Sequence, residues 1–322
     1  MMFLAIEIGG TKLQLGVGSG TGQPLQALER RTVDPDRRSA GILQQIAELA
    51  PDLIQQHGVR AIGIGFGGPV DRSGGTVIKS HQIEGWENFS ITAWSRQRLQ
   101  RPTCLGNDSD LAGLAEARFG AGKGHRVVFY SNVGSGIGGA LVIDGELYLG
   151  GKSGASEIGH LRPHWDPTGS DHTVSDHTVE SLASGWGMTA VARAGLLDEE
   201  RQDDPSVREL RALCADDVSR LDGKILATAL IRGNAFAGDI FRQGIRAYGW
   251  GLAQVITLLG PDVVVVGGGI PLIGEEHYMV PLRSCVEECV FSPRRGTYQL
   301  KSAELGEEMV LHGALALASA SV

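Results

Sequence analysis

Apolar runs that end in glycine recur along the chain and predict strands that lead into ligand-facing loops. Residues 3–8 (FLAIEI) are apolar except for Glu7, and residues 9–12 (GGTK) separate them from the alternating pattern of residues 13–17 (LQLGV). This pattern predicts a strand–turn–strand hairpin. Because glycine lets an anion approach the backbone closely, such a hairpin can present N–H groups and a hydroxyl to a phosphate.

The same motif returns in the second half of the chain. Residues 127–132 (VVFYSN) predict a strand, residues 134–139 (GSGIGG) a glycine turn with a hydroxyl, and residues 140–143 a second strand. Two such hairpins suggest a duplicated βββαβα core that holds phosphates from both sides. Two further apolar strands, 61–66 and 263–266, also end in glycine loops.

The stretch from Pro102 to Glu116 (PTCLGNDSDLAGLAE) predicts a strand, a tight turn and a helix. The helix pattern places Leu111, Leu114 and Ala115 on one face and Glu116 on the other. Asp108 and Ser109 can each cap the helix N-terminus through a side-chain oxygen. Because ligands bind at strand ends in α/β sheets, Asp108 can alternatively be a base that takes a proton from a bound hydroxyl.

Helical periodicity marks several other segments. Residues 37–56 predict a helix in which Pro51 introduces a kink or break. Further helices are expected at 91–99, 180–194, 224–259 (as two helices), 275–290 and 308–318, with a strand at 298–301.

Length and composition narrow the class of protein. A chain of 322 residues can hold two domains, and 42% hydrophobic with 20% charged residues is ordinary for a globular enzyme. A net charge of -8 without a basic block argues against nucleic acid as a partner. Neither a signal peptide nor an apolar run of about 20 residues is present, so we expect a cytoplasmic protein without membrane association.

Three polar features have two interpretations each. Glu7 within an apolar strand needs a partner such as Mg²⁺ or a catalytic water. In the loop of residues 81–89, Trp86 and Asn88 can line a sugar pocket, or Trp86 can simply anchor the loop. The His-rich segment 164–177 can be a metal loop or a solvated loop, and we favour the latter because its spacing matches no metal-site template.

With these pieces in place, the chain resembles the ROK family of sugar kinases, the glucokinase-like members of the hexokinase–actin–Hsp70 superfamily. The resemblance rests on an ordered set of stretches: IEIGGTKLQLG, GIGFGGPVD, GWENF, GNDSDLAGLAE, NVGSGIGGALVIDGELYLG with SEIGH, and VVVVGGGI. It implies an α/β fold of two ribonuclease H-like (actin-like ATPase) domains with an interdomain cleft. The implied domains are residues 1–118 plus 303–322, and residues 119–302.

The resemblance also implies the site residues. Asp108 would be the catalytic base, and the sugar would be bound by Gly68, Asn88, Asn107, Asp108, Glu157, His160 and Glu180. ATP and Mg²⁺ would be bound by Glu7, Gly9, Gly10, Thr11, Lys12, Gly134, Ser135 and Gly136, with Gly267, Gly268 and Gly269 beside the adenosine. The implied activity is transfer of the ATP γ-phosphate to a sugar hydroxyl, first of all the 6-OH of glucose, by a homodimer.

Three departures from the family pattern qualify this expectation. Glu7 stands where the family usually has aspartate, which moves the carboxylate by about 1.5 Å. The cysteine-rich zinc motif is missing, since cysteine is absent between Cys104 and Cys214, so no metal site is expected. Ser135 replaces a common threonine and keeps the hydroxyl.

Two other functions stay open beside the kinase. One is a sugar-binding or regulatory ROK protein with weak or lost catalysis, because of Glu7. The other is a sugar-responsive transcription regulator, which we expect less because the phosphate hairpin begins within the first dozen residues and leaves no place for a helix-turn-helix before it.

Overall fold

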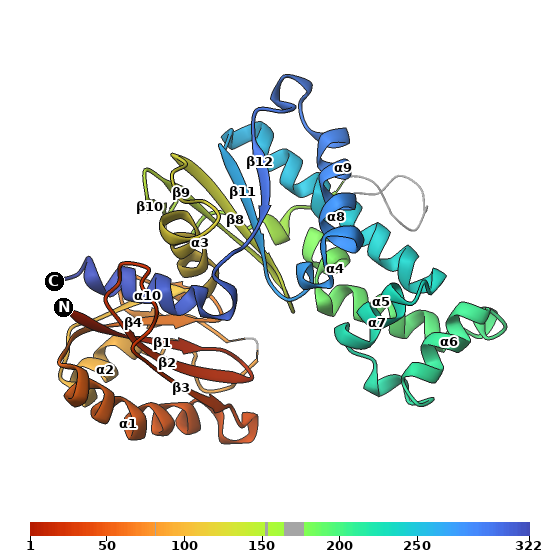
Figure 1. Cartoon of the computed structure of the whole chain (residues 1–322). Helices are drawn as coiled ribbons and strands as arrows, with labels where there is room; N and C mark the ends of the chain where they lie inside the picture. Colours follow the sequence, from red (N-terminus) through yellow and green to blue (C-terminus); the bar gives the residue numbers. More distant parts are fainter. Residues whose placement is uncertain (81, 152–153, 164–176) are drawn as a thin grey trace. The chain divides into compact units, whose positions relative to one another are not determined.

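The computed structural model describes residues 1–80, 82–151, 154–163 and 177–322 (Figure 1). The chain forms two compact units. The first comprises residues 1–130, 140–155 and 303–322, and the second comprises residues 131–139 and 156–302. The first unit thus contains residues 119–130 and 140–155, which the predicted boundary at residue 118 assigns to the other domain.

The first unit is built on a five-stranded sheet with the order β3-β2-β1-β4-β7. β1 pairs antiparallel with β2 and parallel with β4, which in turn pairs parallel with β7. Strands β5 and β6 form a separate two-stranded sheet. The bounds of these strands are β1 Met2–Ile8, β2 Lys12–Gly18, β3 Ala27–Thr32, β4 Val59–Phe66, β5 Val70–Asp71, β6 Thr76–Val77 and β7 Thr103–Asn107.

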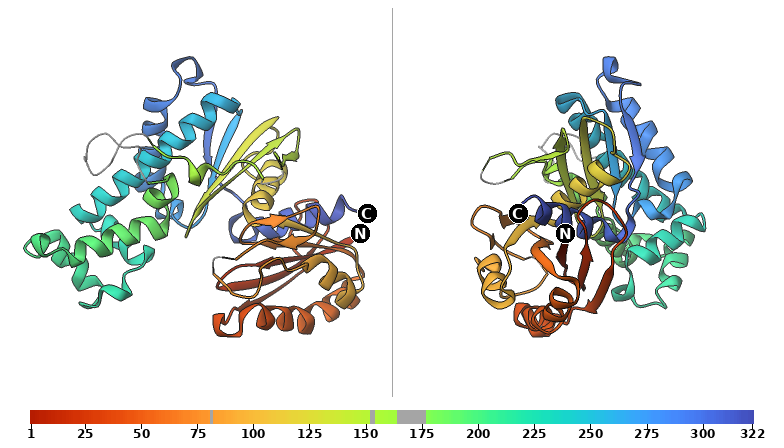
Figure 2. Two further views of the ribbon diagram at one scale, coloured as in Figure 1. Left: turned by 180° about the vertical axis from the view of Figure 1, so that it is seen from behind. Right: turned by 60° about the vertical axis from the view of Figure 1, so that its left-hand side comes forward.

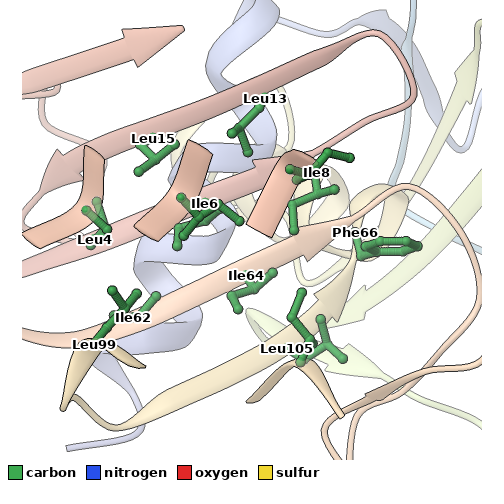
Figure 3. Close-up of a cluster of buried hydrophobic side chains, with 14 of the residues drawn as sticks. Leu4, Ile6, Ile8, Leu13, Leu15, Ile62, Ile64, Phe66, Leu99 and Leu105 are labelled. Carbon is green, nitrogen blue, oxygen red and sulfur yellow. The ribbon is translucent and has the colours of Figure 1, made fainter. Parts of the chain in front are cut away.

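Alternation along β1 divides the core of the first unit between the two faces of its sheet. Leu4, Ile6 and Ile8 pack toward α1 (Arg38–His57) and α2 (Ile91–Leu99), whereas Phe3 and Ala5 pack toward α3 (Asp108–Phe119) and α10 (Met309–Ser319). The views in Figure 2 show α1 and α10 on opposite faces of this sheet. Figure 3 shows the first of these clusters, which includes Leu13, Leu15, Ile62, Ile64, Phe66, Leu99 and Leu105.

Of the kink or break predicted at Pro51, the break was wrong, because helix α1 continues through this residue. Proline removes one backbone hydrogen bond from a helix interior. Pro51 is exposed, and water can therefore satisfy the carbonyl that it leaves free on the solvent side of the helix.

Helices α3 (Asp108–Phe119) and α10 (Met309–Ser319) close the other face of the sheet. Glu116 of α3 does not lie on a solvent face as predicted, because it is fully buried. Its carboxylate accepts hydrogen bonds from the N–H groups of Ala121 (2.9 Å), Glu304 (3.0 Å) and Leu305 (2.8 Å). The carboxylate therefore joins the end of α3 to the segment that leads into α10.

A second sheet has the order β10-β9-β8-β11-β12. Its strands are β8 Val127–Val133, β9 Ile137–Ile143, β10 Glu146–Tyr148, β11 Val263–Gly267 and β12 Gln299–Ser302. β9 and β10 form an antiparallel hairpin, and β11 pairs parallel with β12, as the fully apolar β11 sequence predicts. Strands β8 and β9 contribute residues to both units.

The second unit is otherwise largely helical, with α8 packed against α4 and α9. The single helix predicted at 180–194 is two helices, because the Ser184 side chain accepts from the Gly187 N–H and begins a new helix at Gly185. The segment predicted as one helix at 275–290 starts with a wide turn at Glu275–Met279. The helices are α4 Val179–Ala183, α5 Gly185–Leu197, α6 Pro205–Leu213, α7 Gly223–Ile231, α8 Ala235–Leu259 and α9 Val280–Cys289.

Candidate functional site

In the first unit, the ends of three parallel strands bring the predicted catalytic residue Asp108 together with the predicted sugar-binding residues Gly68 and Asn107. The Gly67 N–H, after β4, donates to the Ile8 carbonyl at the end of β1 (3.0 Å). The Asn107 side chain, at the end of β7, donates to the Gly68 carbonyl (3.0 Å). A Cβ atom on Gly67 would lie 3.4 Å from the Asp108 Oδ2 atom. The β1, β4 and β7 ends thus place Asp108 beside the first glycine hairpin.

Asp108 is the first residue of α3, and its side chain is not the cap. The cap is Asn107, whose Oδ1 atom accepts from the N–H groups of Ser109 (2.9 Å) and Asp110 (3.3 Å). Of the two interpretations of Asp108, the capping one is therefore wrong, and Ser109 is not the cap either. Asp108 Oδ1 accepts from the adjacent Ser109 N–H at 2.8 Å.

The environment of Asp108 makes its carboxyl group a stronger base. Burial raises the pKa of Asp108 to about 6, against the lowering effect of the Ser109 N–H and the Asn107 side chain. An acid with this pKa is mostly ionised at neutral pH, yet it binds a proton more readily than an ordinary aspartate does.

The first glycine turn has the predicted form. Ile8 and Leu13 are the last paired residues of β1 and β2, and the Gly9 N–H donates to the Lys12 carbonyl across the turn (3.0 Å). Lys12 Nζ lies 3.6 Å from Glu307 Oε2. Beside the turn is a surface depression of about 340 Å³, lined by Thr11, Lys12, Arg30, Arg31 and Thr32. Of these residues, Thr11 and Lys12 belong to the turn itself, and a hydroxyl and an ammonium group of this kind suit phosphate oxygens.

Glu7 is the half-buried carboxylate that the sequence singled out. Its Oε2 atom accepts from Gln14 Nε2 at 2.7 Å. Burial raises the pKa of Glu7; Gln14 and Lys12 lower it, and the charges of Asp108 and Glu307 raise it. The carboxylate of Glu7, with that of Asp108 near it, lies beside the Gly9–Lys12 turn. Carboxylate oxygens next to a phosphate-binding turn suit a hydrated Mg²⁺ ion.

Gly68 and Asn88 are in backbone conformations that favour small or amide residues. Gly68 has φ +154°, and a Cβ atom there would lie 3.0 Å from the Lys79 carbonyl oxygen. Asn88 is exposed with φ +54°. Trp86 is fully buried and packs edge-on against Phe66, with ring centroids 5.2 Å apart. The structure therefore supports the anchoring interpretation of Trp86.

The second unit brings together two of its predicted glycine loops. The Ile270 N–H donates to the Val133 carbonyl (3.1 Å), and a Cβ atom on Gly268 (φ +95°) would lie 2.3 Å from that oxygen. Residues 267–269 thus lie against the end of β8, which leads into Gly134–Gly136. Ser135 is exposed, and its carbonyl accepts from the Trp186 N–H (3.2 Å) at the start of α5.

Glu157, His160 and Glu180 also gather in the second unit. Glu157 and His160 are exposed at the two ends of one short turn, with the His160 N–H donating to the Glu157 carbonyl (3.1 Å). Glu180 Oε2 accepts from the Ile137 N–H (2.7 Å), and a Cβ atom on Gly159 would lie 3.3 Å from the Glu180 Cβ. Part of the hydrogen-bonding capacity of Glu180 is therefore used by the backbone.

Within the described ranges, no group of three or more His, Cys, Asp or Glu side chains is placed to hold a metal ion. Of the His-rich segment 164–177, only His177 lies inside those ranges. Among the helices of the described residues, none has the length and apolar character needed to cross a membrane.

Sequence reasoning missed two residues that contact the candidate site. Gln14 bonds Glu7, and Arg30 bonds Gln14 through Nε (2.7 Å). The signal for Gln14 was present, since a polar residue lies between Leu13 and Leu15 in a buried strand. Nothing in the sequence marked Arg30 as a contact of this site, because the segment that forms strand β3 has no alternation of apolar residues.

Comparison with known proteins places this chain in a family. A glucokinase of Thermotoga maritima is 28% identical over 98% of this chain and 97% of its own length. A glucokinase of Streptomyces coelicolor is 30% identical over 98% of this chain and 96% of its own. The crystal structure of a ROK family glucokinase from Streptomyces griseus, in complex with glucose and AMPPNP, is 30% identical, has a TM-score of 0.80 and covers 99% of both chains.

The predicted fold class is confirmed, since the structure is mixed α/β and its structural neighbours are ROK sugar kinases of the actin-like ATPase fold. The ROK family model matches residues 3–321. This chain therefore belongs to the ROK family.

Proposed function

We propose that this protein is an ATP-dependent hexose kinase that transfers the ATP γ-phosphate to a sugar hydroxyl, with the 6-OH of glucose as the first candidate. The observation that carries the proposal is the position of Asp108. It combines a raised pKa with a place at the end of β7, next to the Gly9–Lys12 turn. The whole-length similarity to glucokinases supports the same activity.

Asp108 would act as the base in this reaction. As the sugar oxygen forms its bond to the γ-phosphorus, the bond from that phosphorus to the bridging oxygen of ADP breaks, and the sugar proton moves to an Asp108 oxygen. Phosphoryl transfer depends mostly on positioning and charge neutralisation, so the base completes a step that the phosphate-binding groups prepare. Asn107 would hold a neighbouring sugar hydroxyl.

The residues present fit ATP and Mg²⁺. The turn of Gly9, Gly10, Thr11 and Lys12, and that of Gly134, Ser135 and Gly136, supply backbone N–H groups and hydroxyls for phosphates, with Gly267, Gly268 and Gly269 beside the adenosine. Glu7 supplies an oxygen toward Mg²⁺, an ion that typically uses one or two carboxylates plus substrate phosphates. When bound, Mg²⁺ would neutralise charge on those phosphates.

The remaining assignments concern the sugar. Gly68, Asn88, Glu157, His160 and Glu180 would bind it, since carboxylates, amides and imidazoles match hydroxyls that both donate and accept. Matched relatives also include an N-acetylgalactosamine kinase of Shewanella and a xylose repressor of Caldicellulosiruptor bescii. Family membership alone therefore fixes neither the sugar nor the activity, and a weakly active sugar-binding protein is the alternative.

A coupled assay of ADP release over a panel of hexoses tests the proposal. We expect turnover with at least one hexose, and glucose to give the highest kcat/KM. Glucose, mannose, fructose, allose and N-acetylated hexosamines form the panel, and each sugar without ATP is the control. Sugar binding by calorimetry without any turnover would instead support the catalytically weak alternative.

The acid limb of the pH profile is a second expected result. Asp108 accepts a proton only when ionised, and burial raises its pKa to about 6. We expect kcat/KM to be constant above about pH 7 and to fall about tenfold per pH unit well below pH 6.

Nucleotide phosphates titrate near the same pH, with a second pKa of about 6. Calorimetric affinities for AMPPNP at each pH therefore serve as the control. A profile that stays flat from pH 7 to pH 5 after this correction would remove Asp108 from the role of base.

Two expectations about the cell remain proposals. We propose that the protein acts in the cytoplasm on small-molecule sugar and nucleotide. We also propose that it forms a homodimer, which size-exclusion chromatography with light scattering would detect as twice the chain mass of 34.1 kDa.

A further inference from the structure

Three polar side chains form a row across the first three strands of the first unit. Glu7 of β1 lies directly opposite Gln14 of β2, and Gln14 lies directly opposite Arg30 of β3. Gln14 Nε2 donates to Glu7 Oε2 at 2.7 Å, and Arg30 Nε donates to Gln14 Oε1 at 2.7 Å. Strand register therefore places the whole row, since residues directly opposite in neighbouring strands are within contact distance.

The chemistry of the row fixes the orientation of the Gln14 amide. A guanidinium group can only donate, so the amide oxygen must face Arg30 and the amide nitrogen must face Glu7. Gln14 is fully buried. A buried amide is costly when it is unpaired, so these two hydrogen bonds account for a polar residue at this place.

We propose that Gln14 is a positioning residue that holds the Glu7 carboxylate toward a Mg²⁺–nucleotide, and that Arg30 holds Gln14 in turn. The inference rests on the proposed function for the use of Glu7, but its contacts are independent of that function. Neither Gln14 nor Arg30 is assigned to touch substrate.

The proposal explains how glutamate serves where the family pattern has aspartate. The extra methylene moves the carboxylate by about 1.5 Å and adds a rotatable bond. A shift of about 1 Å in a reacting geometry can cost on the order of a hundredfold in rate. The Gln14 hydrogen bond holds Oε2 and restricts the orientation of the carboxylate, and in the proposal Oε1 is the oxygen used by the ligand.

Other charged groups face Glu7 and are unchanged by the proposed tests. Lys12 attracts the carboxylate, and Asp108 and Glu307 repel it. Arg30 also lies 3.7 Å from Glu308 Oε1, in an ion pair whose side chains are 49% and 36% exposed. Such exposed pairs contribute little, so the effect of Arg30 on Glu7 is expected to pass through Gln14.

Arg31 gives a matched control for Arg30. Both line the same depression beside Thr11 and Lys12, and their side chains are 45% and 49% exposed. Arg31, however, bonds Glu29 and a neighbouring carbonyl instead of Gln14. Removing either arginine takes away the same positive charge, but only Arg30→Ala breaks the row.

The test is calorimetric titration of the full chain with AMPPNP, with and without Mg²⁺. We expect Gln14→Leu and Arg30→Ala to reduce the Mg²⁺-dependent gain in affinity by about 10–100-fold, the range seen when residues that orient metal ligands are lost. Affinity without Mg²⁺ should stay within about twofold. Arg31→Ala should leave the gain unchanged.

A double-mutant cycle with Glu7→Gln completes the test. If Gln14 acts through Glu7, Gln14→Leu should cause no further loss of the Mg²⁺-dependent gain in the Glu7→Gln background. Equal effects of Arg30→Ala and Arg31→Ala, an additive cycle, or no Mg²⁺-dependent gain in the wild type would each overturn the proposal. The proposed function fails separately, through the absence of turnover in the ADP assay.

Discussion

Replacing Asp108 by asparagine is expected to lower kcat by about 10²–10⁴-fold, the contribution that a positioned general base typically makes. Asparagine keeps the size and hydrogen-bonding reach of the side chain but cannot take up the sugar proton. Calorimetry should show nearly unchanged glucose binding, because the Asn107 cap that positions this turn is retained. Steady-state kinetics with the preferred hexose measures the effect.

Asp110→Asn is the matched control for this variant. Asp110 lies in the same first turn of α3 and carries the same charge, so its replacement costs the helix the same favourable dipole interaction. It has no assigned contact with substrate, and kcat should stay within a few-fold of the wild type. Turnover retained by Asp108→Asn would contradict the base assignment and, with it, the mechanism.

The Glu116→Ala variant is expected to cause the largest loss of stability. Alanine at this position removes the carboxylate that accepts hydrogen bonds from the N–H groups of Ala121, Glu304 and Leu305. A buried donor that loses its partner costs about 1–3 kcal/mol, and of these three residues only Ala121 is buried, so we expect a loss of about 2–4 kcal/mol. Urea unfolding followed by circular dichroism, with the tryptophan signal as a second probe, measures the change.

Glu48→Ala provides the comparison for this measurement. Glu48 is an exposed helical glutamate of α1 that bonds the Gln44 side chain. Its replacement should change stability by no more than about 0.5 kcal/mol. Equal stabilities of the two variants would show that the Glu116 hydrogen bonds do not hold α10 and α3 together.

Much of the fold could be predicted from local pattern. The alternation in residues 3–8 and 13–17 and the apolar run at 263–266 predicted β1, β2 and β11, because burial on one or both faces of a sheet sets the period of apolar residues. The glycine loop after β11 was predictable from the backbone conformation that it needs. Only a small residue adopts positive φ, as at Gly268, without strain.

Elements whose stability comes from neighbours were missed. Strand β3 (ALERRT) has no apolar alternation, yet it pairs with β2 along six residue pairs. Its hydrogen-bonding partner is supplied by the sheet, so its own side chains need not mark it. The Arg30–Gln14 contact was missed for that reason, and so was the support it gives to Glu7.

Helix ends were also decided by specific hydrogen bonds. Asn107, Asp108 and Ser109 all have oxygens that can cap a helix, and sequence alone did not identify Asn107 as the residue that does so. Which one caps decides whether the Asp108 carboxylate is used by the helix or is available to a ligand.

The sequence by itself determined most of the strands, most of the helices and the ordered motifs of the family, because these depend on residues close together in the chain. Only the tertiary structure decided where isolated polar residues go. Glu116 has the spacing of a solvent-facing residue but is buried, since its acceptor oxygens meet N–H groups 188 and 189 residues further along the chain. A periodic pattern cannot encode a partner at that distance, so the burial of a charge follows from packing alone.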